Sequence, residues 1–179
     1  MSDNIYTEVP SLDLADFTSG DPEKKAAFVQ ALGAAYTNIG FVAIKNHGLS
    51  DELTDRLYST IKHFFDLDEA VKSKYEIPGL AGQRGYIGKG KEHAKGRTTG
   101  DLKEFYHVGQ NVTDGDAIKA QYPDNVWPDE LPELETIGIE AYSKLESAGT
   151  TMLQAIALYL GIDEHYFDQK VHNGNSILR

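Results

Sequence analysis

Apolar residues recur at every third or fourth position in several stretches of the chain, which is the spacing of one face of a helix. The first stretch follows Asp21 and Pro22, a cap residue and a proline that suit the start of a helix. It is closed by Gly40, a residue common at helix ends. The pattern therefore predicts a helix between them, and its apolar face consists of Phe28, Leu32, Ala35 and Ile39.

Further helices are predicted downstream. Ser50 is a good N-cap for the second helix. A short helix is expected within residues 67–77, a long one from Glu133 to Leu160, and a final short one within residues 163–171. The inner face of the second helix consists of Leu53, Leu57, Ile61 and either Phe64 or Phe65.

Strand-like segments are fewer and shorter. Val9–Phe17 alternates in polarity, Phe41–Lys45 is rich in β-formers and is expected to be a buried strand, and Leu102–Gly109 is a third candidate. The last residues, "NSILR", read as the start of a fourth. The glycine-rich stretch 79–101 is expected to be weakly structured. Helices with a few strands predict an α+β fold.

Composition excludes several classes of function. Among 179 residues the formal net charge is -11, which makes nucleic acid and anionic membranes poor partners. The absence of cysteine excludes disulfides and thiolate chemistry and fits a cytoplasmic protein. No secretory signal and no apolar run long enough to span a bilayer are found.

The six histidines do not form a recognisable metal motif. None stands in a His-x-Asp, His-x-Glu or HExxH sequence, although a site built from scattered ligands stays open. His47 lies between Asn46 and Gly48 where a predicted strand ends, so it is either a catalytic or metal-binding residue or part of the turn. We favour the turn, because an imidazole there can bond to the backbone.

The segment Arg84–Arg97 carries a local excess of four positive charges in this acidic chain. One interpretation is a solvated basic loop, whose cations pair with Asp101 and Glu104. The other is a wall that attracts a small molecule bearing a carboxylate or phosphate. In that case an arginine of the segment would bind a carboxylate through two donors, and Tyr86 would add an aromatic face or a hydroxyl.

Several stretches together resemble one known family in the family's own order. These are "GFVAIKNHGLS", "FFDLDEAVKSKY", "RGYIG" followed by "DLKEFYHVG", "NVWPDELPELE", and "LGIDEHYFDQKV" followed by "NSILR". They cover most of residues 8–179 and are similar to the N-terminal region of the isopenicillin N synthase-like dioxygenases.

The resemblance implies an Fe(II)-dependent oxygenase that uses O2 and, in most members, 2-oxoglutarate to oxidise a small molecule. The family's core is a double-stranded β-helix, a jelly-roll variant. Its His-x-Asp, distal His and Arg-x-Ser lie beyond the equivalent of Arg179. The resemblance therefore implies a helix-rich N-terminal part with an incomplete barrel. Residues 1–120 would form the N-terminal region, and residues 121–179 the connector, the long helix and the first strand.

For individual residues, the resemblance implies that Arg84 and Tyr86 are substrate contacts and that Asn175 and Arg179 either face the pocket or only pack. No catalytic residue or metal ligand is expected in this chain. Alone, it is expected to bind no catalytic iron, to release no succinate and to self-associate through unpaired strand edges. Two alternatives stay open: a non-catalytic module that binds a small molecule or a protein, and a family oxidase that does not use 2-oxoglutarate.

Overall fold

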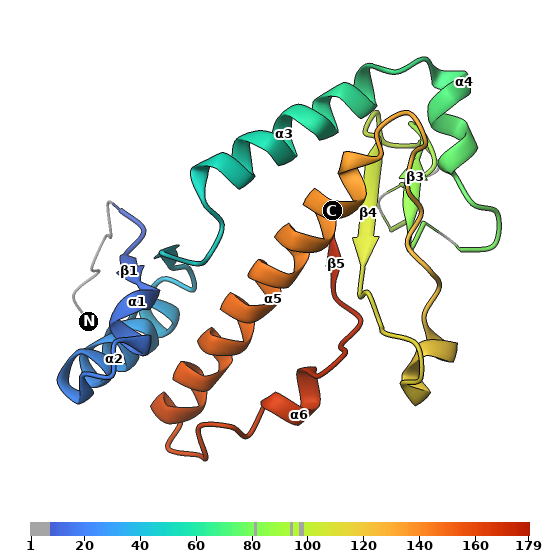
Figure 1. The fold of residues 1–179 in the computed structure, drawn as a ribbon. Coiled ribbons are helices and arrows are strands. Elements are labelled where there is room, and N and C mark those ends of the chain that lie inside the picture. Colours follow the sequence, from blue (N-terminus) through green and yellow to red (C-terminus); the bar gives the residue numbers. More distant parts are fainter. Residues whose placement is uncertain (1–7, 81, 94, 97–98) are drawn as a thin grey trace. The chain divides into compact units, whose positions relative to one another are not determined.

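The structure is a computed structural model that describes residues 8–80, 82–93, 95–96 and 99–179 (Figure 1). The chain divides into two compact units. The first unit comprises the chain up to Leu49 together with Lys144–His172, and the second comprises Ser50–Ser143 together with Asn173–Arg179. The long helix α5 (Glu133–Tyr159) contributes residues to both.

The first unit is mainly helical. Its two short strands pair in parallel, with Leu12 of β1 opposite Ile44 of β2. Its core residues are Leu14, Phe17, Phe28, Val29, Leu32 and Ala155. Besides part of α5, its elements are β1 (Ser11–Asp13), α1 (Leu14–Thr18), α2 (Pro22–Asn38), β2 (Ala43–Lys45) and α6 (Asp168–Val171).

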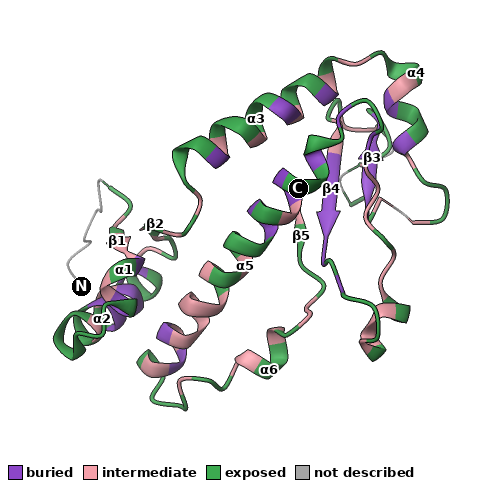
Figure 2. Ribbon diagram, viewed as in Figure 1, coloured by how far each residue is buried: buried purple, intermediate pink, exposed green. Residues whose placement is uncertain are grey.

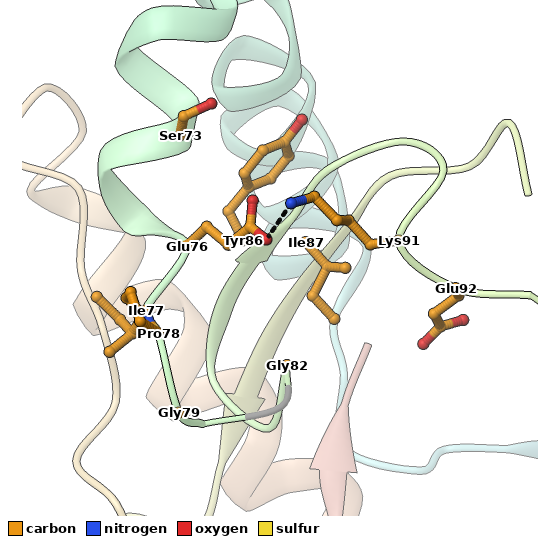
Figure 3. A pocket seen from close by; sticks show the side chains of 10 residues that line it. All are labelled: Ser73, Glu76, Ile77, Pro78, Gly79, Gly82, Tyr86, Ile87, Lys91 and Glu92. Carbon is orange, nitrogen blue, oxygen red and sulfur yellow. Dashed lines mark ion pairs between the residues drawn. The ribbon is translucent and has the colours of Figure 1, made fainter. Parts of the chain in front are cut away.

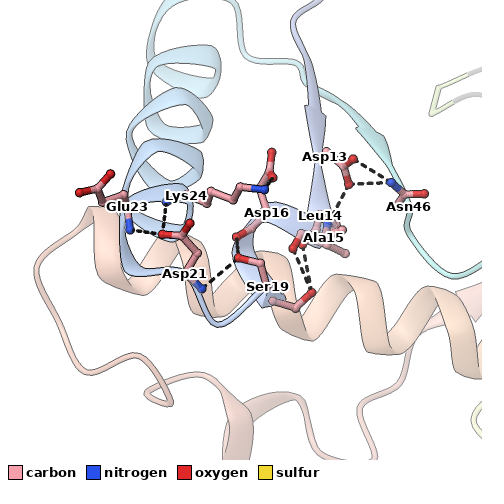
Figure 4. Close-up of polar contacts among 10 residues, drawn as sticks. Asp13, Leu14, Ala15, Asp16, Ser19, Asp21, Glu23, Lys24 and Asn46 are labelled. Carbon is pink, nitrogen blue, oxygen red and sulfur yellow. Dashed lines mark hydrogen bonds and ion pairs between the residues drawn. The ribbon is translucent and has the colours of Figure 1, made fainter.

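Two aspartates set the local structure at the start of the chain (Figure 4). Asp13 accepts a hydrogen bond from the backbone N–H of Ala15, which starts α1 directly after β1. The expected strand over residues 9–17 therefore ends at Asp13, and its second half is helical, which corrects the prediction. Asp21 caps α2 by accepting from Glu23 and Lys24, as predicted for this helix start.

Close packing joins α2 to the C-terminal part of α5 within this unit. A Cβ added to Gly33 would lie 2.0 Å from a ring carbon of Tyr159. The glycine therefore leaves the space on α2 that the Tyr159 ring occupies. The predicted strand at residues 41–45 exists only as β2, and its residues are exposed or half-buried rather than buried. The reason is that β2 pairs on one side with β1 alone among the described strands.

The second unit is built around a three-stranded antiparallel sheet of order β3-β4-β5. Buried residues run along β3 and β4 (Figure 2), and Phe64, Tyr106 and Leu134 belong to the core beside them. Besides part of α5, its elements are α3 (Asp51–Asp66), α4 (Glu69–Lys72), η1 (Ser73–Tyr75), β3 (Gly85–Ile87), β4 (Phe105–Gly109), η2 (Ala117–Gln121) and β5 (Ile177–Leu178).

A side chain continues the ladder where β3 stops. Gly85 pairs with His107, so Gly109 would face residue 83 if β3 were longer. Asn125 takes that place: its Oδ1 accepts from Gly109 N at 2.8 Å, and its Nδ2 donates to Gly109 O at 3.0 Å. The connector before α5 is thereby fixed to the edge of β4.

Most predicted elements are confirmed, including the helix that Ser50 caps, the long helix and the final strand. The strand β3 was not predicted, because it lies inside the glycine-rich stretch. The α+β class is confirmed by the helices and the two small sheets. In the described part of the chain, no helix combines the length and apolarity needed to cross a bilayer.

Candidate functional site

A cavity of about 570 Å³ opens in the second unit beside β3 (Figure 3). The segment after η1 forms one wall, and the loop after β3 forms another. Apolar side chains and glycines alternate with charged groups along these walls. The lining residues are Ser73, Glu76, Ile77, Pro78, Gly79, Gly82, Tyr86, Ile87, Lys91 and Glu92.

Ion pairs tie the loop after β3 to its surroundings. Lys91 Nζ lies 3.2 Å from Glu76 Oε1 across the cavity, as the dashed line in Figure 3 marks. Glu92 pairs with Arg179 at 2.5 Å, and the Arg179 guanidinium stands 3.6 Å from the centre of the Phe105 ring. Arg179 therefore reaches the cavity wall through Glu92, and its side chain stays partly exposed.

Tyr86 lies at the base of the cavity but is only 1% exposed. Its hydroxyl donates to Glu104 at 2.6 Å and lies 3.1 Å from Glu69. Burial, and then the hydrogen bond to Glu104, raise the pKa of Tyr86 far above its usual range, so it stays protonated. The structure thus places this hydroxyl in an internal network.

Lys72 holds the other side of that network. It is 4% exposed and donates to Glu104 at 2.7 Å and to the Phe65 carbonyl at 3.2 Å. Burial alone would lower the pKa of Lys72, but the hydrogen bonds and charges of Glu104 and Glu69 outweigh it and leave the pKa raised. The role of Lys72 could not be predicted from the sequence, because Glu104 lies 32 residues away along the chain.

Arg84 is fully buried and does not line the cavity. Its Nη1 donates to the Gln83 carbonyl at 2.7 Å. The guanidinium lies against Gly109, where a Cβ would be 1.9 Å from Arg84 Cζ. Burial lowers the pKa of Arg84 from its usual range. Asn175, the remaining candidate, is exposed in the segment that leads into β5 and does not line the cavity.

Two of the four described cations of the basic loop have a carboxylate partner. Lys89 lies 3.7 Å from Glu104, and Lys91 pairs with Glu76. The predicted pairing of this loop with Glu104 is confirmed for Lys89, whereas Asp101 pairs with Lys103. Arg97, also part of the segment, lies outside the described residues.

His47 takes part in a backbone turn. Its Nδ1 accepts a hydrogen bond from Leu49 N at 3.3 Å, and Asn46 and Gly48 both have positive φ. This geometry is that of the turn interpretation. Among residues 8–80, 82–93, 95–96 and 99–179, no group of three or more His, Asp or Glu side chains is placed to hold a metal ion.

The family described as "non-haem dioxygenase in morphine synthesis N-terminal" matches residues 9–130. The chain belongs to this family of dioxygenase N-terminal regions, which confirms the resemblance found in the sequence.

Individual relatives agree with this family. The chain is 33% identical to proline hydroxylase buaE of Petromyces alliaceus, over 96% of this chain and 54% of that protein. A solved structure of a protein assigned to the 2OG-Fe(II) oxygenase family of Caulobacter crescentus superposes with a TM-score of 0.82 at 32% identity, over 96% of this chain and 55% of the other.

Full-length T7H of Neurospora crassa, solved with alpha-KG (2-oxoglutarate), is similar at a TM-score of 0.75 and 25% identity, over 94% of this chain and 49% of that one. The chain spans about half the length of the curated relatives it matches.

Proposed function

We propose that this chain is the N-terminal region of an Fe(II)- and 2-oxoglutarate-dependent oxygenase that uses O2 to oxidise a small molecule. The observation that carries the proposal is the family match over residues 9–130. Relatives named as 2-oxoglutarate-dependent enzymes and a neighbour solved with alpha-KG support the choice of cofactor.

The chain's own contribution lies on the substrate side. We propose, as the resemblance implies, that the iron ligands are not among the residues of this chain. We propose Arg84 and Tyr86 as substrate contacts, and Asn175 and Arg179 as residues that either face the substrate or only pack. For Tyr86 this contact would be made by the ring, because the hydroxyl is bonded to Glu104.

The proposed substrate carries an anionic group. Arg84 is a cation without a described carboxylate partner, whereas Lys91 and Arg179 are already paired with Glu76 and Glu92. This difference supports Arg84 as the residue that meets the anion. A cytoplasmic location stays a prediction from the sequence.

The test is to isolate the protein from its natural host and incubate it with Fe(II), 2-oxoglutarate and O2. We expect succinate to form only when all three are present, and the intact mass to exceed 19.8 kDa by roughly as much again, as the half-length match to relatives suggests.

Two other outcomes would overturn the proposal. A mass of 19.8 kDa without succinate would favour a binding module. Oxidation of a substrate without any need for 2-oxoglutarate would favour the family's other type of oxidase.

A further inference from the structure

The buried guanidinium of Arg84 makes a hydrogen bond on one edge and none on the other among the described residues. Nη1 donates to the Gln83 carbonyl, while Nε and Nη2 have no hydrogen-bond partner among the described residues. The N–H bonds of Nε and Nη2 on that edge run parallel to each other. This pair is the fork through which arginine binds both oxygens of a carboxylate.

A buried cation needs a counter-charge. Moving an ion from water into a protein interior costs roughly several kcal/mol, even after the protein relaxes. A partner of opposite charge or hydrogen bonds to the ion can offset this cost. The titratable groups that act on Arg84 are Tyr142 and Tyr122, and no described carboxylate is among them. Because arginine does not lose its proton in proteins, the charge remains.

The surroundings hold this fork in place and add further polar groups. Gly109 leaves the space that the guanidinium fills, and Asn125 fixes Gly109 through both backbone atoms. Two more buried atoms without described partners, His107 Nε2 and Gln110 Oε1, belong to residues within two positions of Gly109. Buried polar atoms without a protein partner are few in folded proteins, and such an atom marks a place for a bound water, an ion or a polar group of a ligand.

The nearby connector offers a route to the fork. Tyr122 and Asn125 belong to it, and the preceding η2 buries none of its residues. Segments with little buried apolar surface open at low cost in free energy. A small molecule would reach Arg84 by local opening of this connector, which breaks the bonds of Tyr122 to the Asn173 carbonyl and of Asn125 to Gly109.

We propose that Arg84 binds the carboxylate of a small molecule, with Nε and Nη2 donating to its two oxygens beside Gly109. The identity of that molecule as the substrate rests on the proposed function, whereas the carboxylate site itself does not. No iron, 2-oxoglutarate or turnover is needed to detect it.

The experiment follows the Nε–H resonance of Arg84 by ¹⁵N NMR while the full-length protein, labelled at its arginines, is titrated with acetate. We expect a saturable shift with acetate and none with acetamide, which has the same shape without the charge. Sodium chloride at equal ionic strength should not reproduce the shift. An equal shift with chloride, or no shift with acetate, would refute a carboxylate site.

Variants provide the second readout. Arg84→Lys keeps the charge and loses the fork, so acetate should bind at least about tenfold more weakly. Arg56→Lys, at an exposed position of α3, is the matched control and should bind acetate normally. Unchanged affinity in folded Arg84→Lys would contradict the proposal. Should that variant fail to fold, the acetate and acetamide titrations of the original chain decide alone.

Discussion

Glu104 is the residue on which three side chains of the second unit converge. Lys72 and Tyr86 bond to its Oε2, and Lys89 lies near its Oε1. Burial alone would raise the pKa of Glu104, but the bonds from Lys72 and Tyr86 outweigh it and leave the pKa below its usual value. This carboxylate therefore joins β3 to α4 from just before β4.

Replacing Glu104 by Gln should destabilise the protein by about 1.5–3 kcal/mol, because the buried Lys72 ammonium loses its shorter charge-assisted hydrogen bond and keeps only Glu69, 3.3 Å away, as a charged partner. Chemical denaturation measures the change. Glu140→Gln, at an exposed position of α5, is the control and should change stability by less than about 0.5 kcal/mol. Equal stability of the two variants would show that the ion pair contributes nothing.

The same variant should alter the acid limb of the stability curve. A carboxylate whose folded pKa is lowered contributes stability above its unfolded pKa, near 4.5, and loses it as pH falls through the folded value. The loss of stability below pH 4.5 should therefore be shallower in Glu104→Gln than in the original protein.

At the scale of single residues, only part of the site could be predicted from the sequence. The pairing of a loop lysine with Glu104 could be predicted from opposite charges nearby in the chain. The burial of Arg84 and Lys72 could not, because it depends on Gly109 and Phe65, which only the fold brings to them. A charged residue in a polar stretch gives no sequence signal that it will be buried.

At the scale of elements, α2 packs against α5 at Gly33, which contacts the ring of Tyr159. Gly33→Ala should destabilise by about 1–3 kcal/mol, because its Cβ meets the Tyr159 ring. In a Tyr159→Ala background the same change should instead stabilise by up to about 1 kcal/mol through helix propensity. Thermal or chemical denaturation of the four proteins of this cycle measures both values.

Gly149→Ala is the matched control in α5, where an added Cβ meets nothing within 4 Å. It should stabilise by up to about 1 kcal/mol. If Gly33→Ala is as stable as Gly149→Ala, the Tyr159 ring moves aside at no cost in stability. The Tyr159 residue is 39% exposed, so its ring has room for such a movement.

Helices were predictable as elements because caps and periodicity are local. Ser50 accepts from Leu53 N, and Gly161 has the positive φ expected after α5. The strand β3 was not predictable, since its three residues include Gly85 and depend on pairing with β4. Likewise, Leu14–Thr18 forms a helix where most of this segment was expected to be strand, because Asp13 caps the helix.

At the scale of the whole molecule, the described strands form sheets of two and three members with outer strands. Unpaired strand edges promote association between copies. We expect the 179-residue chain to sediment as dimers or larger species as concentration rises. Ile177→Lys, in the outer strand β5, should reduce this association, and a monomer at every concentration would contradict the expectation.

Asn125 restricts where such association can begin. The side-chain amide of Asn125 bonds to both the backbone N–H and the carbonyl of Gly109. It thereby replaces the two backbone hydrogen bonds that a residue of a neighbouring strand would make. An incoming strand finds no hydrogen-bonding group free at that point, and β3 cannot slide along β4 to lengthen its own pairing. A single side chain thus acts as a stop that defines both the end of the sheet and its alignment.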